Sequence, residues 1–91
     1  MTQTPIASAL PAAAPQLDSF KEAVNKAMSA ATITQSANSQ DDWLLVVSQR
    51  QEAIAQMKAV PASHSKYTVA QQKIMEYQRN LDYAQKNAAA Q

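Results

Sequence analysis

The sequence predicts an all-α fold of three helices, in which the last two helices form a long antiparallel hairpin. Apolar residues recur at helical spacing in three segments, near residues 19–31, 40–59 and 66–90. No segment shows the strict alternation of apolar and polar residues that is typical of a strand. The connection over residues 60–65 is short, which favours an antiparallel pairing of the two helices that it joins.

The first helix is predicted to begin at Pro15 or Ser19 and to end near Ala31. Ser19 and Glu22 have the spacing of a capping box, in which a hydroxyl caps the helix and a carboxylate lies three residues later. The apolar residues of this segment share one face of the helix, at Phe20, Val24, Ala27, Met28 and Ala31. The helical period is then lost until residue 40.

The second helix is predicted over residues 40–59. Either Asn38 or Ser39 is a favourable N-cap, and the carboxylates of Asp41–Asp42 suit the positive end of the helix dipole. Adjacent helical side chains point about 100° apart, so these two carboxylates do not converge on a metal ion. Pro61 ends the helix, because the residue before a proline is driven out of the α region.

One face of the second helix is apolar except for a single arginine. The apolar members of this face are Trp43, Val46, Val47, Ala53, Ile54 and Met57. Arg50 lies on the same stripe, while Leu44 and Leu45 lie to either side of it and widen the apolar surface. We expect Trp43 either to anchor the core or to bind a partner. Arg50 either extends its guanidinium to water, stacks on Trp43 or Tyr77, or binds a partner.

The third helix is predicted from Lys66 to Ala90. Its apolar residues are separated by alternating steps of three and four, which is the period of a coiled coil. The stripe consists of Tyr67, Ala70, Ile74, Tyr77, Leu81, Ala84 and Ala88, and Tyr83 lies off it.

The composition excludes several classes of site. The chain has no cysteine and no glycine, which excludes disulfide scaffolds, thiolate metal sites and glycine-rich phosphate loops. Eight basic and seven acidic residues leave a formal charge of +1, too little to predict a nucleic-acid partner. His64, the only histidine, is expected to be an exposed turn residue, since a metal needs further ligands. We therefore predict no catalytic, cofactor or metal site and no enzyme activity.

Residues 1–14 are predicted to form a flexible tail rich in alanine and proline, and residues 15–91 a single helical domain. The alternative for the tail is a short docking segment around Ile6 and Leu10. The tail lacks the positive charge and unbroken apolar run of a secretory signal, and no segment has the roughly 20 apolar residues of a membrane span. We expect a cytoplasmic protein that does not insert into membranes.

The segment from Phe20 to Ala84 carries a pattern of a tryptophan, Ala-Ile, Val-Pro, a tyrosine and Tyr-Gln-x-Asn-Leu. The matching positions are Trp43, Ala53–Ile54, Val60–Pro61, Tyr67 and Tyr77–Leu81. The pattern resembles a short helical module that recurs in cyanobacterial proteins, in which an aromatic residue stands at the place of Arg50. The hairpin also resembles a tetratricopeptide-type helix pair, with longer helices. The resemblance implies an accessory or regulatory role in that cell type and names no partner.

The function predicted is that of a non-catalytic protein–protein interaction module, an accessory or adaptor subunit that presents helix faces to a protein partner. The candidate partner-binding residues are Trp43, Leu44, Leu45 and Arg50. The alternative is a self-assembling subunit, a dimer or a polymer, because small cores often recruit a second copy and the last helix has a heptad period. A glycine-free helical hairpin is also similar to secretion-system needle and inner-rod subunits, although the apolar C-terminal end expected of those subunits is missing.

Overall fold

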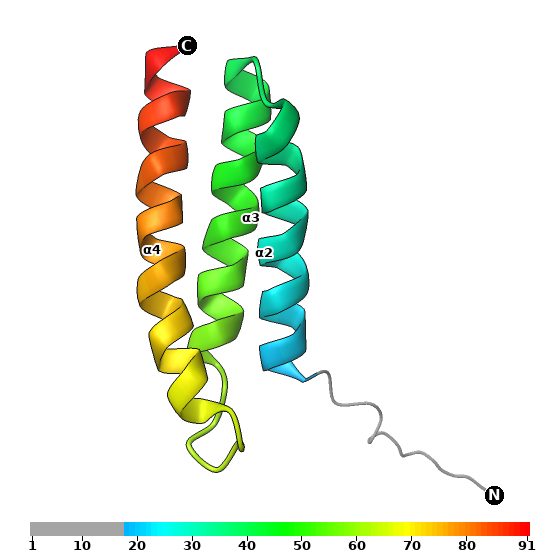
Figure 1. Cartoon of the computed structure of the whole chain (residues 1–91), viewed down its shortest axis with the longest axis vertical. Helices are drawn as coiled ribbons and strands as arrows, with labels where there is room; N and C mark the ends of the chain where they lie inside the picture. Colours follow the sequence, from blue (N-terminus) through cyan, green and yellow to red (C-terminus); the bar gives the residue numbers. More distant parts are fainter. Residues whose placement is uncertain (1–17) are drawn as a thin grey trace, which may run out of the picture.

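A computed structural model describes residues 18–91 and contains three helices and no strand in that range (Figure 1). The helices are α2 (Ser19–Ser36), α3 (Gln40–Lys58) and α4 (Tyr67–Ala90). The predicted all-α fold is confirmed, and α3 and α4 form the predicted antiparallel hairpin. The predicted tail, residues 1–14, lies outside the described residues.

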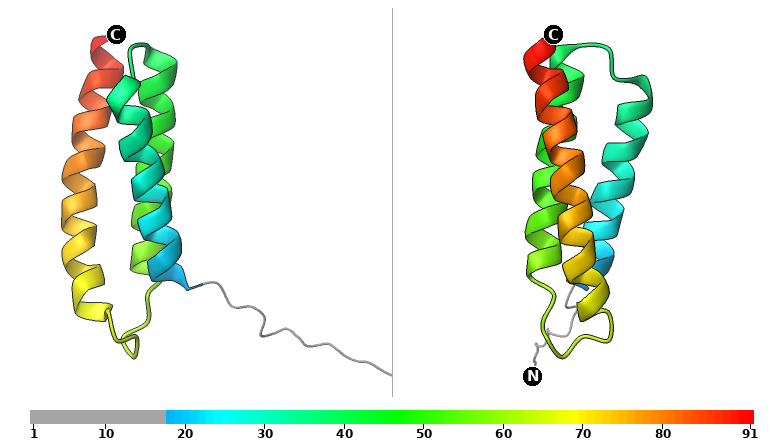
Figure 2. Two further views of the ribbon diagram at one scale, coloured as in Figure 1. Left: turned by 45° about the vertical axis from the view of Figure 1, so that its right-hand side comes forward. Right: turned by 60° about the vertical axis from the view of Figure 1, so that its left-hand side comes forward.

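The central helix is α3, which packs against both α2 and α4, whereas α2 and α4 approach each other at few points. In Figure 2, α2 stands in front of α3 in one view and α4 stands in front of it in the other. Because these views are turned in opposite directions from Figure 1, by 45° and by 60°, α2 and α4 lie on neighbouring sides of α3 and flank the face that Figure 1 shows. A space between two helices that share a third one as their base is a natural place for a groove.

The N-terminus of α2 is capped by Asp18 and not by Ser19, so the predicted capping residue is wrong by one position. The Asp18 carboxylate accepts hydrogen bonds from the backbone N–H groups of Phe20, at 2.9 Å, and Lys21, at 3.4 Å. An ionised carboxylate is a stronger acceptor than a hydroxyl and interacts favourably with the helix dipole. The same carboxylate is also held by His64, a contact described below.

The first helix continues to Ser36, beyond the predicted end at Ala31. The hydroxyls of Thr32 and Thr34 donate to backbone carbonyls four residues earlier, at 3.1 and 2.8 Å, which satisfies both groups inside the helix. Ile33 packs against a buried cluster of α3 and α4 side chains. Tertiary packing thus overrides the low helix propensity of this threonine-rich segment.

The other helix ends agree closely with the prediction. Ser39 caps α3 by accepting from the N–H of Asp42 at 3.2 Å, and the Asp42 carboxylate accepts in return from the N–H of Asn38 at 3.1 Å. This reciprocal pair satisfies two N–H groups at the helix start. The helix ends at Lys58, three residues before Pro61, and the third helix is confirmed to within one residue of its predicted start.

The core is rich in alanine and divides into two clusters. The Met57 cluster contains Ala23, Ala27, Ala53, Ile54, Met57, Val60, Ala70 and Tyr77. The Trp43 cluster contains Ala30, Trp43, Val46, Ala84 and Ala88. Small side chains on facing helices let the backbones approach closely, so a 74-residue body can be packed with few large residues.

The predicted apolar stripes of α3 and α4 are confirmed, except that Tyr67, at the first position of α4, is exposed. In α2 the buried face differs from the predicted one. Ala23, Ala27 and Ala30 are buried, whereas Met28 has 63% of its surface exposed. Ala31 is also exposed. The apolar face of α2 is therefore wider than its seam with α3, and the excess borders the space between α2 and α4.

Candidate functional site

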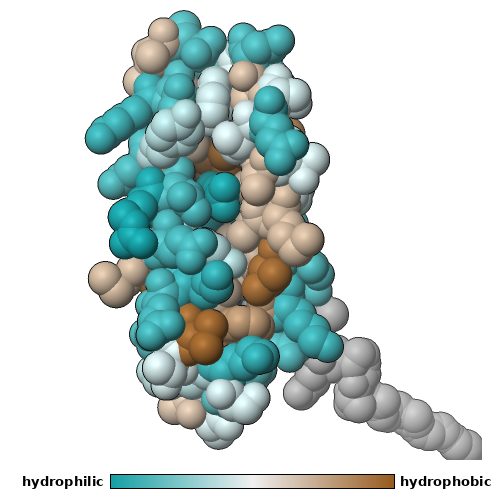
Figure 3. Space-filling view, viewed as in Figure 1, coloured by the Kyte–Doolittle hydropathy of each residue, from teal (hydrophilic) through white to brown (hydrophobic). Residues whose placement is uncertain are grey.

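A groove runs between α2 and α4, with α3 as its floor, and we call it the α2–α4 groove. It encloses about 350 Å³. Its lining residues are Val24, Ala27, Met28 and Ala31 of α2, Arg50 of α3, and Lys73, Glu76, Tyr77 and Asn80 of α4. Figure 3 shows this side of the molecule, where apolar surface gathers along α2 and hydrophilic surface covers much of α4. One wall of the groove is therefore apolar and the other is mainly polar.

The floor of the groove holds a cation with few partners. Arg50 is only 9% exposed, and its Nη1 donates a long hydrogen bond of 3.4 Å to the carbonyl of Ala27. Its Nε is buried and bonds to no described group. Within residues 18–91 no carboxylate forms an ion pair with this guanidinium. Burial lowers the pKa of Arg50, which Tyr77 and Glu76 oppose, but a guanidinium remains charged in proteins.

The other charges of the groove are paired with each other. Lys73 Nζ lies 3.4 Å from the Glu76 carboxylate, one turn along α4. Tyr77 is 4% exposed, and burial raises the pKa of its hydroxyl, so the phenol stays neutral. Among the described residues of the groove, Arg50 is thus the cation without an ion-pair partner, and Glu76 acts on it only at longer range.

The four predicted site residues do not form one surface. Trp43 is 6% exposed, and its ring meets the ring of Tyr83 edge-on at 5.8 Å. Leu44 and Leu45 are about half exposed. They lie six and five residues before Arg50, or about 120° and 140° around the helix. The structure thus places Trp43 in the core, Arg50 on the groove floor, and the two leucines on the outer side of α3.

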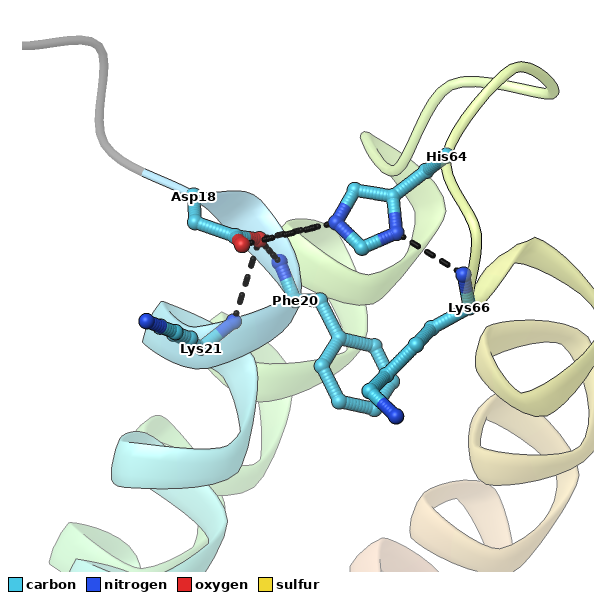
Figure 4. Close-up of polar contacts among 5 residues, drawn as sticks. All are labelled: Asp18, Phe20, Lys21, His64 and Lys66. Carbon is cyan, nitrogen blue, oxygen red and sulfur yellow. Dashed lines mark hydrogen bonds and ion pairs between the residues drawn. The ribbon is translucent and has the colours of Figure 1, made fainter.

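A second hollow, of about 310 Å³, lies where the α3–α4 connection meets the start of α2. His64 Nε2 lies 3.2 Å from the Asp18 carboxylate, and His64 Nδ1 accepts from the N–H of Lys66 at 2.9 Å (Figure 4). Because Nδ1 accepts, the ring proton sits on Nε2 and is donated to Asp18. The ring of Phe20 lies beside the imidazole, with the centroids 6.0 Å apart. Lys66 Nζ is 5.9 Å from the centroid of the Phe20 ring.

His64 lies in the turn between α3 and α4, as predicted, but the prediction that it is exposed is wrong. Only 23% of its side chain is exposed, because the imidazole contacts Asp18 of α2's N-cap. Partial burial of Asp18 raises the pKa of its carboxyl. The hydrogen bonds from His64, Lys21 and Phe20 outweigh burial, and the pKa lies below its ordinary value. This arrangement holds two segments together and has the character of a structural clasp.

No three His, Cys, Asp or Glu side chains gather at metal-binding distance within residues 18–91. None of the three helices has the length and apolar character required to cross a bilayer. The chain matches no family model, no curated protein and no solved structure. The resemblance to the cyanobacterial helical module stays a prediction.

Sequence reasoning missed both the groove and the clasp. The groove had a signal, since Met28 and Ala31 made the predicted apolar face of the first helix wider than one helix seam needs. The clasp had none, because Asp18 and His64 are 46 residues apart. Only the packing of the helices brings these two side chains together.

Proposed function

We propose that the chain is a non-catalytic protein–protein interaction module, an accessory or adaptor subunit that binds a helix of its partner in the α2–α4 groove. The observation that carries this proposal is the groove itself. α2 and α4 flank one face of α3 without meeting over it, and Met28 stays exposed on the α2 wall of the groove. Binding of an amphipathic helix in an apolar groove is a recurrent mode of recognition.

The chemistry of the groove favours binding over catalysis. Its titratable side chains are Arg50, Lys73, Glu76 and Tyr77. Lys73 and Glu76 pair with each other, and Tyr77 is buried and neutral. A general base needs a free acceptor that can take a proton from a substrate, whereas the Glu76 carboxylate pairs with Lys73 and the Tyr77 phenol is buried. An accessory role is therefore the better proposal.

Affinity capture from a lysate of the source organism tests this function, with the whole chain as bait. Met28→Glu places a charge in the groove, and Leu44→Glu is the matched control on the outer side of α3. Both native side chains are half exposed or more, so neither change is expected to disturb the fold, which circular dichroism checks. We expect Met28→Glu to lose the captured partner and Leu44→Glu to retain it.

Other outcomes count against the proposal. Loss with Leu44→Glu alone assigns binding to the outer leucines and not to the groove. Equal capture by all three baits shows that neither surface is used. A wild-type bait that enriches no protein over a bead control contradicts the adaptor function.

Self-assembly is the second candidate. The heptad stripe of α4 is used within the chain, where Ala70, Tyr77 and Ala84 are buried against the other helices. The observation that favours self-assembly is the exposed pair Leu44 and Leu45 on the outer side of α3. Sedimentation equilibrium at several concentrations tests it, with Leu44→Glu as the disrupting variant. A monomer mass at every concentration removes this candidate.

A further inference from the structure

The strongest unexplained feature of the molecule is the buried cation on the floor of the α2–α4 groove. We propose that Arg50 receives an aspartate or glutamate side chain from the docked helix of a partner protein. This inference rests on the proposed function, because it names the chemistry that the partner helix must carry.

The guanidinium of Arg50 makes few hydrogen bonds in the free protein. Arg50 has five N–H donors, of which one Nη1 donor makes a long bond to the Ala27 carbonyl and the buried Nε donor has no partner among the described residues. A buried donor without an acceptor costs free energy, and a buried charge without a counter-charge costs more. The side chain therefore gains most from a ligand that brings a negative charge and two acceptor atoms.

A carboxylate has this chemistry. Its two oxygens match the spacing of adjacent guanidinium donors and accept from them in a bidentate arrangement. Within the groove, the carboxylate of Glu76 acts on Arg50 only through its charge, and its bond is to Lys73. No described carboxylate lies at ion-pair distance from the guanidinium, so a bidentate partner is left for another chain to supply.

The shape of the groove points to a helix as the carrier. Its walls are two helices, and its apolar wall consists of short or flexible side chains: Val24, Ala27, Met28 and Ala31. A fourth helix that lay between α2 and α4 would contact both of them. Together with α3, the four helices would form a bundle. A docked helix would also cover Met28, which is 63% exposed in the free protein.

The 17 residues that precede the described part of the chain do not supply this carboxylate, because they contain no aspartate and no glutamate. A second copy that met the first groove to groove about a two-fold axis would bring Arg50 against Arg50, and the two cations repel. We therefore assign the groove to a different chain, which carries an acidic residue between apolar ones.

A displayed library of amphipathic helices tests the inference without knowledge of the partner. The peptides have about 20 residues, or about 30 Å of helix, and are randomised along one face among apolar, acidic, basic and amide residues. They are sorted in parallel against the whole wild-type chain and against Arg50→Met. We expect the wild-type protein to select an acidic residue at one shared position, with apolar residues three or four positions to either side. Arg50→Met should select an uncharged residue there.

The best peptide is then synthesised with glutamate or glutamine at the shared position, and both versions are measured by fluorescence anisotropy. We expect glutamine to weaken binding to the wild-type protein at least about tenfold and to leave binding to Arg50→Met unchanged within about twofold. Circular dichroism confirms that Arg50→Met is folded. Met28→Glu should abolish binding of either peptide, because it blocks the groove.

The failures of the two proposals are distinguishable. Helices that bind the groove but show no shared acidic position, or an equal effect of glutamine on both proteins, overturn the assignment to Arg50 and leave the proposed function standing. A library from which the wild-type protein selects no helix sensitive to Met28→Glu overturns both proposals. If the protein is a dimer in solution and becomes a monomer with Met28→Glu, a second copy of the chain occupies the groove. This outcome also overturns the inference.

Discussion

Met57 and Arg50 lie two turns apart on the same stripe of α3, and their surroundings differ. Met57 is completely buried, with alanines and other apolar residues of α2 and α4 around it. Arg50 is almost as buried, but it lies under an open groove with one donor unpaired. The same helix face is thus closed by core packing at one point and left open to a groove at the other.

The contrast shows which spaces between the helices an alanine-rich core can fill and which it leaves open. Alanines bring helices close along the seams of α3, but they do not reach across from α2 to α4. Where larger side chains such as Met57 and Ile54 fill the space, the core is complete. Where they do not, the long side chain of Arg50 occupies the floor and brings a charge with it.

Truncation of Met57 should have the largest effect on the free energy of unfolding. Met57→Ala leaves a cavity in the fully packed cluster, and we expect a loss of about 3 kcal/mol in urea denaturation. Met75→Ala is the matched control, because Met75 is 63% exposed, and it should change stability by less than about 0.5 kcal/mol. Equal losses for the two variants would contradict the description of the Met57 cluster as the closed part of the stripe.

Enlargement of a seam alanine should have the next largest effect. Ala53 is completely buried in the Met57 cluster, and Ala53→Leu forces the helices apart at a cost of about 2 kcal/mol. Ala55 lies on the exposed side of the same helix, so Ala55→Leu should leave the unfolding free energy nearly unchanged. A small effect of Ala53→Leu would mean that the seam has room to adapt.

Replacement of Arg50 should act in the opposite direction to these two changes. Arg50→Met keeps most of the side-chain volume and removes a buried charge, so we expect the free energy of unfolding to stay level or to rise by about 1 kcal/mol. Arg79→Met, on the exposed side of α4, is the control. A loss as large as that for Met57→Ala would make Arg50 a structural residue and would remove the contrast between the two positions.

The smallest effect concerns the clasp at the start of α2. The hydrogen bonds to Asp18 lower its pKa below the ordinary value of 3.8, so the folded state binds fewer protons than the unfolded state on the acid side. The stability from the ionised carboxylate is present above pH 3.8 and is lost as the pH falls through the lower folded pKa. We expect the Tm of the wild-type chain to exceed that of Asp18→Asn by a few degrees at neutral pH.

Thermal melts of both proteins between pH 7 and pH 2 check this prediction. The two curves should converge on the acid side, because only the wild-type chain loses a charge at residue 18. A constant separation of the curves over this range would show that the ionised carboxylate is not the source of the difference.

The sequence alone determined the helical class, the order of the helices and most of their ends. Capping residues such as Ser39, the proline after α3 and the heptad stripe of α4 act locally, and local signals of this kind are present in the chain before it folds. The same local reasoning identified Arg50 as an anomaly on an apolar stripe.

Only the tertiary structure decided which apolar faces are used and which remain open. The first helix ends at Ser36, beyond its predicted end, because Ile33 packs against the Trp43 cluster. His64 bonds Asp18 because the packing of the helices brings the two residues together. The groove above Arg50 exists because α2 and α4 lie on neighbouring sides of α3 and do not meet over it. The spacing of residues along one helix defines its faces, but the distance between two helices depends on the side chains of all three.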